Sequence, residues 1–173
     1  MQQLRCTTAE PSAPIGITIQ PDDAPMDDAI RAIILHLLAR HNIMTLATIR
    51  PDGFPQATIV HYVNEGFTLY CATDRTSQKV GNLALNNKVS VAIASETQNA
   101  YKLKALSLSG IATKIVDRAR ALDLQLLLFK AVPAAKRFAP MESDRLVVYS
   151  IAPVAISLVD YATGYGRTFL EEP

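Results

Sequence analysis

Short segments of alternating apolar and polar residues, joined by tight turns, are the feature that most constrains how this chain folds. Residues 43–50 alternate in this way, a Pro-Asp-Gly turn follows at 51–53, and residues 56–63 are rich in β-branched and aromatic side chains. This pattern predicts a β-hairpin. Residues 64–66 predict the next turn, after which residues 67–72 return as a third strand. Strands joined by such short turns favour an antiparallel meander over parallel βαβ units.

The rest of the chain adds strands and three helical segments. Further strands are expected over 88–94, 102–113, 145–151 and 154–161, and helices over 25–40, 77–86 and 117–132. Because no regular βαβ repeat is present, six or seven strands predict an antiparallel barrel with helices outside it. The last helix carries Leu124, Leu127 and Leu128 on more than one side, so it needs cover on more than one face.

Length and charge bound the domain organisation and the partners. A chain of 173 residues suggests one domain, with a flexible arm over the proline-containing residues 1–24 and a folded domain over 25–173. Lys and Arg total 17 against 16 Asp and Glu, and this net charge of +1 creates no field that attracts nucleic acid or an anionic membrane. No segment approaches the ~18 apolar residues of a membrane span, and no secretory leader is visible. The expected location is the cytoplasm.

The sequence contains no local signature of a metal site or of protein-based catalysis. Cys6 and Cys71 lie in unlike contexts without a partner at zinc-binding spacing, so both are expected to be unpaired thiols and no metal is expected. Paired carboxylates and nucleophile–base motifs are absent as well, so catalytic residues stay unassigned. We therefore expect the chemistry to come from a cofactor. His61, within residues 56–63, could donate a proton near a cofactor or simply bond to the backbone.

Residues 69–83 are the most informative stretch for function. A strand is followed by a loop of hydroxyl and cationic residues, and a helix begins near Ser77, so free backbone N–H groups gather at one spot. Thr73, Thr76 and Ser77 carry hydroxyl donors, while Lys79 and Arg75 carry charges. This is the composition of a phosphate site, although helix capping and a solvated surface account for the same residues. Neither GxxxxGK[ST] nor GxGxxG occurs.

Three segments taken together resemble the pyridoxamine 5′-phosphate oxidase-like family of FMN-binding split barrels. They are residues 43–56 (IMTLATIRPDGFPQ), residues 69–79 (LYCATDRTSQK) and residues 82–91 (NLALNNKVSV). The resemblance covers about residues 28–116, and the Gly-Tyr-Gly-Arg tail at 164–167 is similar to an ending of some small members. It implies a mainly β, α+β fold, a six-stranded antiparallel split barrel with flanking helices. It also implies a homodimer with one FMN in each of two clefts at the subunit interface.

The resemblance also implies which residues hold the flavin. It places the phosphate at Thr73, Ser77, Gln78 and Lys79, the ring beside the backbone of Thr58, Ile59 and Val60, and Tyr165 and Arg167 at the cleft. True pyridoxamine phosphate oxidases carry Arg where this chain has Ala57 and Gln78. Each charge-assisted hydrogen bond is worth roughly 1.5–3 kcal/mol, so the missing cations weaken anion binding. Vitamin B6 oxidation is therefore not the expected reaction.

Three functional hypotheses follow. The first is an FMN-binding oxidoreductase that passes electrons from a reduced nicotinamide or another donor to a small-molecule acceptor. The second is a protein that holds a flavin, a haem or a deazaflavin in the same cleft for binding or sensing, without turnover. The third is a structural dimer whose cleft binds no cofactor. An absorption spectrum separates them.

Overall fold

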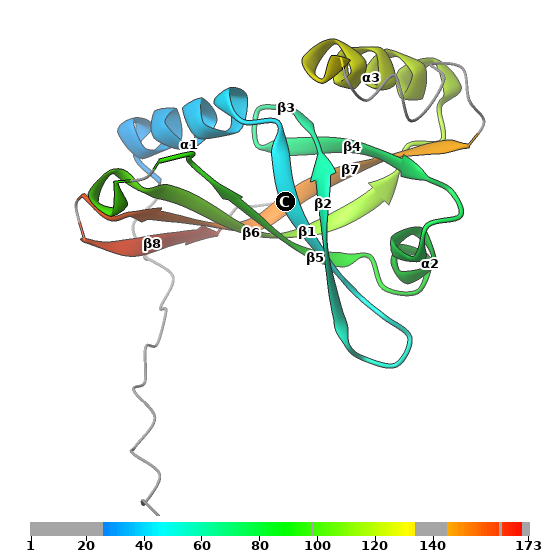
Figure 1. Ribbon diagram of the computed structural model, residues 1–173, viewed down its shortest axis with the longest axis horizontal. Coiled ribbons are helices and arrows are strands. Elements are labelled where there is room, and N and C mark those ends of the chain that lie inside the picture. Colours follow the sequence, from blue (N-terminus) through cyan, green and yellow to red (C-terminus); the bar gives the residue numbers. More distant parts are fainter. Residues whose placement is uncertain (1–25, 98, 134–144, 163, 171–173) are drawn as a thin grey trace, which may run out of the picture.

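The structure, a computed structural model, describes residues 26–97, 99–133, 145–162 and 164–170 (Figure 1). Eight strands form one sheet. They are β1 (Ile43–Ile49), β2 (Pro55–His61), β3 (Val63–Glu65), β4 (Thr68–Asp74), β5 (Lys88–Ala94), β6 (Lys104–Lys114), β7 (Leu146–Asp160) and β8 (Gly164–Leu170). The helices are α1 (Asp28–Arg40), α2 (Gln78–Leu85) and α3 (Arg118–Ala131), with a short 3₁₀ turn at Ala100–Lys102. The arm predicted over residues 1–24 lies outside the described residues.

The sheet is antiparallel throughout and curls until its two ends meet. The strand order is β2-β1-β5-β6-β7-β4-β3, and β8 pairs with β7 beside this path. The end strands β2 and β3 follow each other in the chain and are separated only by Tyr62. This corner brings the two edges of the sheet together, as Figure 1 shows where β2 and β3 meet. The predicted antiparallel split barrel with flanking helices is therefore confirmed.

The six strands that the family resemblance implied are too few, because seven strands lie on the main path and β8 adds another. Residues 56–63 do not form one strand, since the chain turns at Tyr62 between β2 and β3. The expected strands 145–151 and 154–161 are instead the single strand β7, which pairs with β6 from Tyr149 to Asp160. The tail was not expected to form a strand, but residues 164–170 pair with the second half of β7.

A β-bulge explains how β7 continues past a proline. Pro153 has no N–H to donate to the sheet, and proline is therefore tolerated mainly at edges and bulges. The register of β6 against β7 shifts between Ser109 and Gly110, where Gly110 lies opposite Pro153. A Cβ atom on Gly110 would lie 2.8 Å from the carbonyl oxygen of Ala152. Glycine therefore permits the close backbone approach at this point.

The core lies inside the curl of the sheet, and α1 covers it. The side chain of Asp27 accepts a 2.8 Å hydrogen bond from the Ile30 N–H, so α1 begins at Asp28 rather than at the predicted residue 25. The buried residues of α1 are Ile30, Ile34, Leu37 and Leu38. They join inward-facing side chains of the strands, including Met44, Leu46 and Leu106, in one hydrophobic cluster. Burial of this apolar surface is what holds the curled sheet closed.

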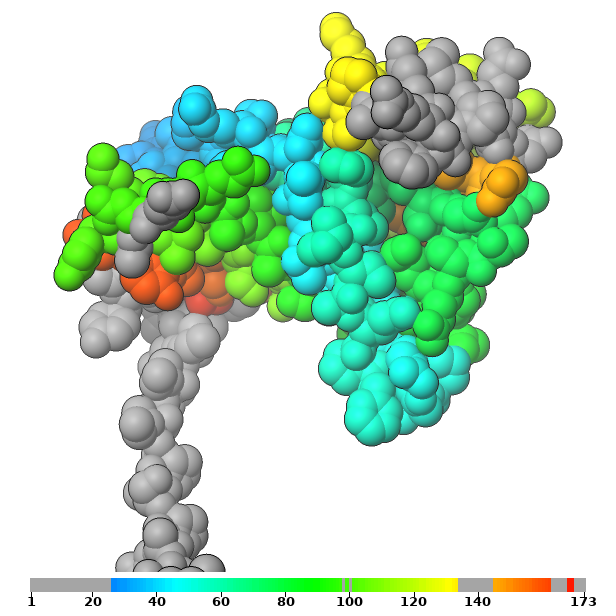
Figure 2. Space-filling model, viewed as in Figure 1, coloured from blue at the N-terminus to red at the C-terminus, as the bar shows by residue number. Residues whose placement is uncertain are grey.

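The helices α2 and α3 pack at other parts of the sheet. In Figure 1, α3 lies over β4 and β7, and α2 lies beside the end of β4. Leu124 and Phe129 of α3 are buried, whereas Leu122, Leu126 and Leu127 are 41–44% exposed. The hairpin of β1 and β2 extends away from the rest of the sheet and forms the cyan lobe at the lower edge of Figure 2.

Candidate functional site

The loop between β4 and α2 is held by its own polar contacts. One carboxylate oxygen of Asp74 accepts hydrogen bonds from the Thr76 N–H at 2.8 Å and the Thr76 hydroxyl at 2.6 Å. The other oxygen accepts from the Arg145 guanidinium at 2.8 Å. These hydrogen bonds, first of all those from Thr76, lower the pKa of Asp74 to about 2. The Thr76 hydroxyl, a candidate phosphate donor in the sequence, is thus used within the loop.

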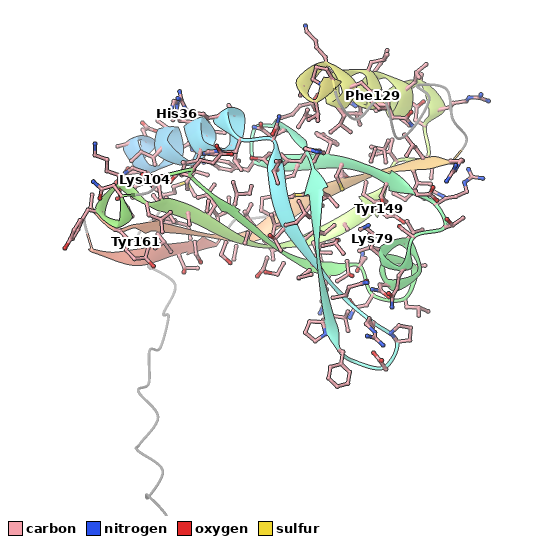
Figure 3. All side chains as sticks on the ribbon, viewed as in Figure 1. His36, Lys79, Lys104, Phe129, Tyr149 and Tyr161 are labelled. Carbon is pink, nitrogen blue, oxygen red and sulfur yellow. The ribbon has the colours of Figure 1, made fainter. Side chains whose placement is uncertain are left out.

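Thr73, Ser77 and Lys79 converge where α2 begins. The hydroxyl oxygens of Thr73 and Ser77 lie 3.3 Å apart, and the Lys79 ammonium donates to the Thr73 hydroxyl at 3.4 Å. Ser77 is the N-cap residue of α2, yet its hydroxyl makes no capping bond. Figure 3 labels Lys79 beside α2, on the side of the helix that faces the sheet. The arrangement places an ammonium and two hydroxyls at the positive end of a helix dipole.

Gln78 joins this cluster through a residue of β2. Its Oε1 accepts a 2.8 Å hydrogen bond from Nε2 of Gln56, which lies near the start of β2. Because an amide oxygen only accepts and an amide nitrogen only donates, the NH₂ group of Gln78 stays available as a donor. The same contact places β2, the strand predicted to lie beside a flavin ring, next to the predicted phosphate loop.

Sequence reasoning missed a buried polar network behind this contact. Nδ2 of Asn82 donates to the Thr48 hydroxyl at 2.9 Å and to Oε1 of Gln56 at 3.0 Å. Asn82 and Thr48 are each only 1% exposed. The positions of these residues in the sequence could have indicated their burial. Thr48 occupies an inward position in the alternation of β1, and Asn82 lies next to the buried Leu83. Polar side chains at core positions indicate hydrogen-bond networks, because buried polar groups need hydrogen-bond partners.

The three β2 residues predicted beside the ring alternate between the two faces of the sheet. Ile59 is 69% exposed and Val60 is buried, while the Thr58 hydroxyl donates to the Leu46 carbonyl at 3.4 Å. Among the described residues, β2 has a paired neighbour only on its β1 side. Its other edge therefore carries backbone N–H and C=O groups that a ring with polar edges can use.

Tyr165 and Arg167 do not lie near Lys79 within one chain. Both belong to β8, which pairs with residues 155–160 of β7, whereas β4 pairs with residues 146–151. Figure 1 shows β8 and α2 at opposite ends of the molecule. The side chains of Tyr165 and Arg167 lie outside the described part of the chain. A site that combines them with Lys79 needs a second copy of the chain.

An apolar surface covers the outer face of the β1–β2 hairpin. Ile43 and Ile49 of β1 are 45% and 36% exposed, and Ile59 of β2 lies opposite Thr45 in the register. Phe54, before β2, is 67% exposed. Exposed apolar patches on a folded domain commonly mark interaction surfaces. We refer to Ile43, Ile49, Phe54 and Ile59 as the hairpin surface.

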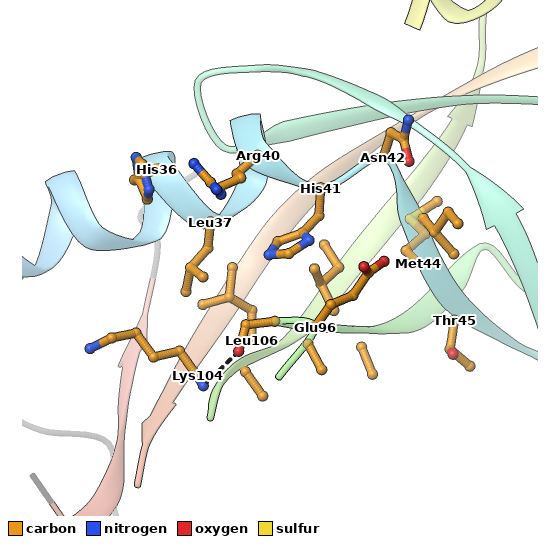
Figure 4. A pocket seen from close by; sticks show the side chains of 16 residues that line it. His36, Leu37, Arg40, His41, Asn42, Met44, Thr45, Glu96, Lys104 and Leu106 are labelled. Atoms are coloured by element: carbon orange, nitrogen blue, oxygen red, sulfur yellow. Dashed lines mark hydrogen bonds between the residues drawn. The ribbon is translucent and has the colours of Figure 1, made fainter. Parts of the chain in front are cut away.

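A separate hollow of about 730 Å³ lies between α1 and the strands β1, β5 and β6. β1 and β5 pair only over residues 45–47 and 90–92, so the two strands separate beyond this region and leave the hollow open. Figure 4 shows His36 and Arg40 on α1 above it, with His41 and Glu96 pointing into it. None of the residues predicted to bind a cofactor lines this hollow.

The remaining titratable candidates have local roles. The ring Nδ1 of His61 lies 3.2 Å from the carbonyl oxygen of Asn42, so the bond to the backbone is present, and the side chain is exposed. Burial raises the pKa of the Cys71 thiol to about 12, with a smaller opposing effect of Lys79. Within the described ranges, no three His, Cys, Asp or Glu side chains gather into a possible metal site. No helix there is long and apolar enough to cross a membrane.

Comparison with known proteins gives a family match. A family model described as pyridoxamine 5′-phosphate oxidase matches residues 26–160. No curated protein matches the chain. A match to this model agrees with the resemblance found in the motifs.

Several solved structures share the fold. A heme-binding protein from Mycobacterium smegmatis has 22% identity and a TM-score of 0.67, covering 78% of this chain and 55% of that chain. A Listeria innocua protein described as a pyridoxamine 5′-phosphate oxidase has 23% identity and a TM-score of 0.64, covering 76% and 98%. A FAD-binding protein from Mesorhizobium loti has 16% identity and a TM-score of 0.61, covering 73% and 91%. Similarity at these identities establishes the fold alone.

Proposed function

The chain belongs to the pyridoxamine 5′-phosphate oxidase family, and on that premise we propose that it is an FMN-binding oxidoreductase. The electrons would pass from a reduced nicotinamide or another donor to a small-molecule acceptor. The observation that carries this proposal is the convergence of Thr73, Ser77 and Lys79 where α2 begins. The positions proposed for the other site residues are argued relative to this cluster.

The cluster fits the phosphate monoester of FMN. A phosphate dianion needs several donors and at least one cation, and the site offers the Lys79 ammonium, two hydroxyls and the NH₂ group of Gln78. The carboxylate of Asp74, which follows Thr73 in the chain, is turned toward Thr76 and Arg145. The positive end of the α2 dipole adds to the attraction.

The residues of the chain bind and orient, and the cofactor supplies the redox chemistry. When bound, the isoalloxazine ring carries the two electrons that leave the donor as a hydride. The backbone at Thr58, Ile59 and Val60 would lie beside that ring, and Gln56 connects this strand to the phosphate cluster. Hydrogen bonds from the free edge of β2 would fix the ring relative to the phosphate.

A homodimer completes the proposed site. The hairpin surface exposes Ile59 and Phe54 at 69% and 67%, next to the strand that would contact the ring. Burying this surface against a second copy removes apolar area from water. Tyr165 and Arg167 of that copy would then be available to the flavin, although they lie far from Lys79 in their own chain. The arrangement would give two equivalent clefts.

An absorption spectrum and a binding titration test the proposal. The protein, purified without added cofactor and again after FMN addition and desalting, should show the visible flavin bands. Lys79→Ala should weaken FMN binding roughly 10- to 150-fold, because one charge-assisted hydrogen bond is worth about 1.5–3 kcal/mol. Lys114→Ala, at the exposed end of β6, is the matched control. A protein that retains no FMN contradicts the proposal, and unchanged affinity in Lys79→Ala contradicts the phosphate position.

Haem binding is the second candidate, and the hollow beside α1 favours it. The hollow combines the imidazoles of His36 and His41, which can ligate iron, with the cation of Arg40, which can pair with a propionate. The Mycobacterium smegmatis relative by fold is a heme-binding protein. Hemin titration of the wild-type protein and of His41→Ala distinguishes the candidates. A change in the Soret band of added hemin that occurs with the wild type and is lost in His41→Ala supports haem in the hollow. Visible flavin bands in the purified protein, with no change in the Soret band of added hemin, support FMN.

A further inference from the structure

We propose that Gln56 is a positioning residue of the phosphate site. It holds the Gln78 amide with its NH₂ group toward the ligand, and it thereby sets how strongly the site distinguishes a phosphate monoester from the same molecule without phosphate. This inference rests on the proposed function. It concerns Gln56, Gln78 and the buried residues behind them, none of which carries a charge.

The three amides form a chain with one direction. Asn82 uses its NH₂ group for two acceptors, the Thr48 hydroxyl at 2.9 Å and Oε1 of Gln56 at 3.0 Å. With its oxygen held by Asn82, Gln56 directs its nitrogen the other way and donates to Oε1 of Gln78 at 2.8 Å. Since donors and acceptors of an amide sit at opposite positions, each bond fixes the orientation of the next.

The chain of amides is anchored in a rigid part of the fold. Thr48 and Gln56 face each other in the register of β1 and β2, and Thr48 and Asn82 are 1% exposed. Buried hydrogen bonds are strengthened by their low-dielectric surroundings, and reversing one amide alone sets a donor against a donor or an acceptor against an acceptor. The exposed Gln78 is therefore oriented together with Gln56 and Asn82.

Orientation matters at this position because an amide has two unlike ends. A guanidinium could only donate here, since every hydrogen-bonding group of a guanidinium is a donor. The amide of Gln78 presents either a donor or an acceptor, and its oxygen would repel a phosphate. Holding Oε1 against Gln56 prevents this and reduces the side-chain entropy lost when the ligand binds.

The test compares FMN with riboflavin, which lacks the phosphate. Gln56→Leu should weaken FMN binding roughly three- to ten-fold, the range of one net hydrogen bond, and leave riboflavin binding unchanged. Inhibition of FMN binding by inorganic phosphate provides a second readout and should weaken by the same factor. Leu85→Gln, at a 73% exposed position of the same helix, is the matched control with no effect on either ligand.

A double variant shows whether Gln56 acts through Gln78. If it does, Gln56→Leu in a Gln78→Leu background should have no further effect on FMN binding. If the losses of FMN affinity in the two single variants add up in the double variant, Gln56 does not act through Gln78 and the proposal is overturned. It is also overturned if Gln56→Leu leaves the ratio of FMN affinity to riboflavin affinity unchanged, since an equal loss of both affinities would indicate a merely structural role. Absence of FMN binding by the wild-type protein would instead reject the proposed function itself.

Discussion

The hydroxyl of Tyr62 donates a 3.0 Å hydrogen bond to the carbonyl oxygen of Leu38. Tyr62 is completely buried at the corner between β2 and β3, and Leu38 lies in the last turn of α1, whose carbonyls lack partners within the helix. The bond therefore joins the corner that closes the barrel to the helix that covers it. Burial also raises the pKa of Tyr62, so its hydroxyl stays a neutral donor.

Removing that hydroxyl should destabilise the fold. Tyr62→Phe leaves the Leu38 carbonyl buried without its partner, and we expect the free energy of unfolding to fall by about 1–3 kcal/mol. Urea denaturation followed by circular dichroism measures the change. Tyr70→Phe removes an exposed hydroxyl that donates to Glu65, and it should cost less than about 1 kcal/mol. Equal effects of the two substitutions would contradict the role given to Tyr62.

Two glycine substitutions should have opposite effects. In Gly110→Ala, the new Cβ would lie 2.8 Å from the Ala152 carbonyl oxygen, so the bulge must distort and stability should fall by about 1–3 kcal/mol. In Gly81→Ala, no atom outside the local backbone of α2 and the two adjacent residues lies within 4 Å of the new Cβ, and the helix propensity of α2 improves by about 0.5–1 kcal/mol. Thermal unfolding of both variants gives the comparison. A neutral Gly110→Ala would show that the bulge does not need glycine.

The loop around Asp74 should make the protein sensitive to acid. The pKa of Asp74 is lowered to about 2 by hydrogen bonds, above all from Thr76, against roughly 3.9 in an unfolded chain. A lowered folded-state pKa stabilises the fold above the unfolded value, and this contribution disappears as pH falls from about 4 to 2. Unfolding free energies of Asp74→Asn should therefore depend less on pH in that window. Parallel pH curves for the wild type and Asp74→Asn would refute the assignment.

The Cys71 thiol should react only when the fold opens. Its side chain is 1% exposed, and burial raises its pKa to about 12, so almost no thiolate forms at neutral pH. In a Cys6→Ser background, a thiol reagent should label the native protein negligibly and label one thiol in denaturant. Rapid labelling of the native protein would mean that the β4 region opens frequently.

A charge on the hairpin surface should disrupt the proposed dimer. Ile59→Glu would place an unpaired carboxylate in the interface, so the dimer dissociation constant should rise at least ~10-fold, and FMN binding should weaken with it. Sedimentation velocity at several protein concentrations measures the assembly. Val116→Glu changes a position that is 88% exposed outside this surface, and it should leave assembly unchanged. A wild-type protein that is monomeric throughout would contradict the proposed arrangement of the cleft.

Much of the fold could be predicted because local chemistry sets it. Alternation located β1 and β5 closely, the Pro-Asp-Gly turn located the first hairpin, and Asp117, whose carboxylate accepts from the Ala119 N–H at 2.9 Å, caps α3 where a helix was expected. The loop from Thr73 to Lys79 was found in the same way, because a strand end, hydroxyls and a helix start are adjacent in sequence. These signals act over a few residues.

The errors arose where a distant segment decided the structure. Pro153 is a local signal for a break, but the bulge at Gly110 of β6 allows β7 to continue. The segment 56–63 reads as one strand, yet Tyr62 turns it because its hydroxyl and N–H bond to Leu38 and Asn42. The tail became β8 because β7 offered it an open edge.

The sequence by itself determined β1 and β5, the turn between β1 and β2, the cap of α3 and the polar residues of the loop from Thr73 to Lys79, because pleat periodicity, turn chemistry and capping depend on neighbouring residues. Only the tertiary structure decided which polar groups support those donors. Thr48 and Asn82 are 34 positions apart, and Gln56 and Gln78 are 22 apart, so their contacts depend on strand register and on how the sheet curls. Register and curl follow from burying one apolar core from all strands at once, which no short segment specifies.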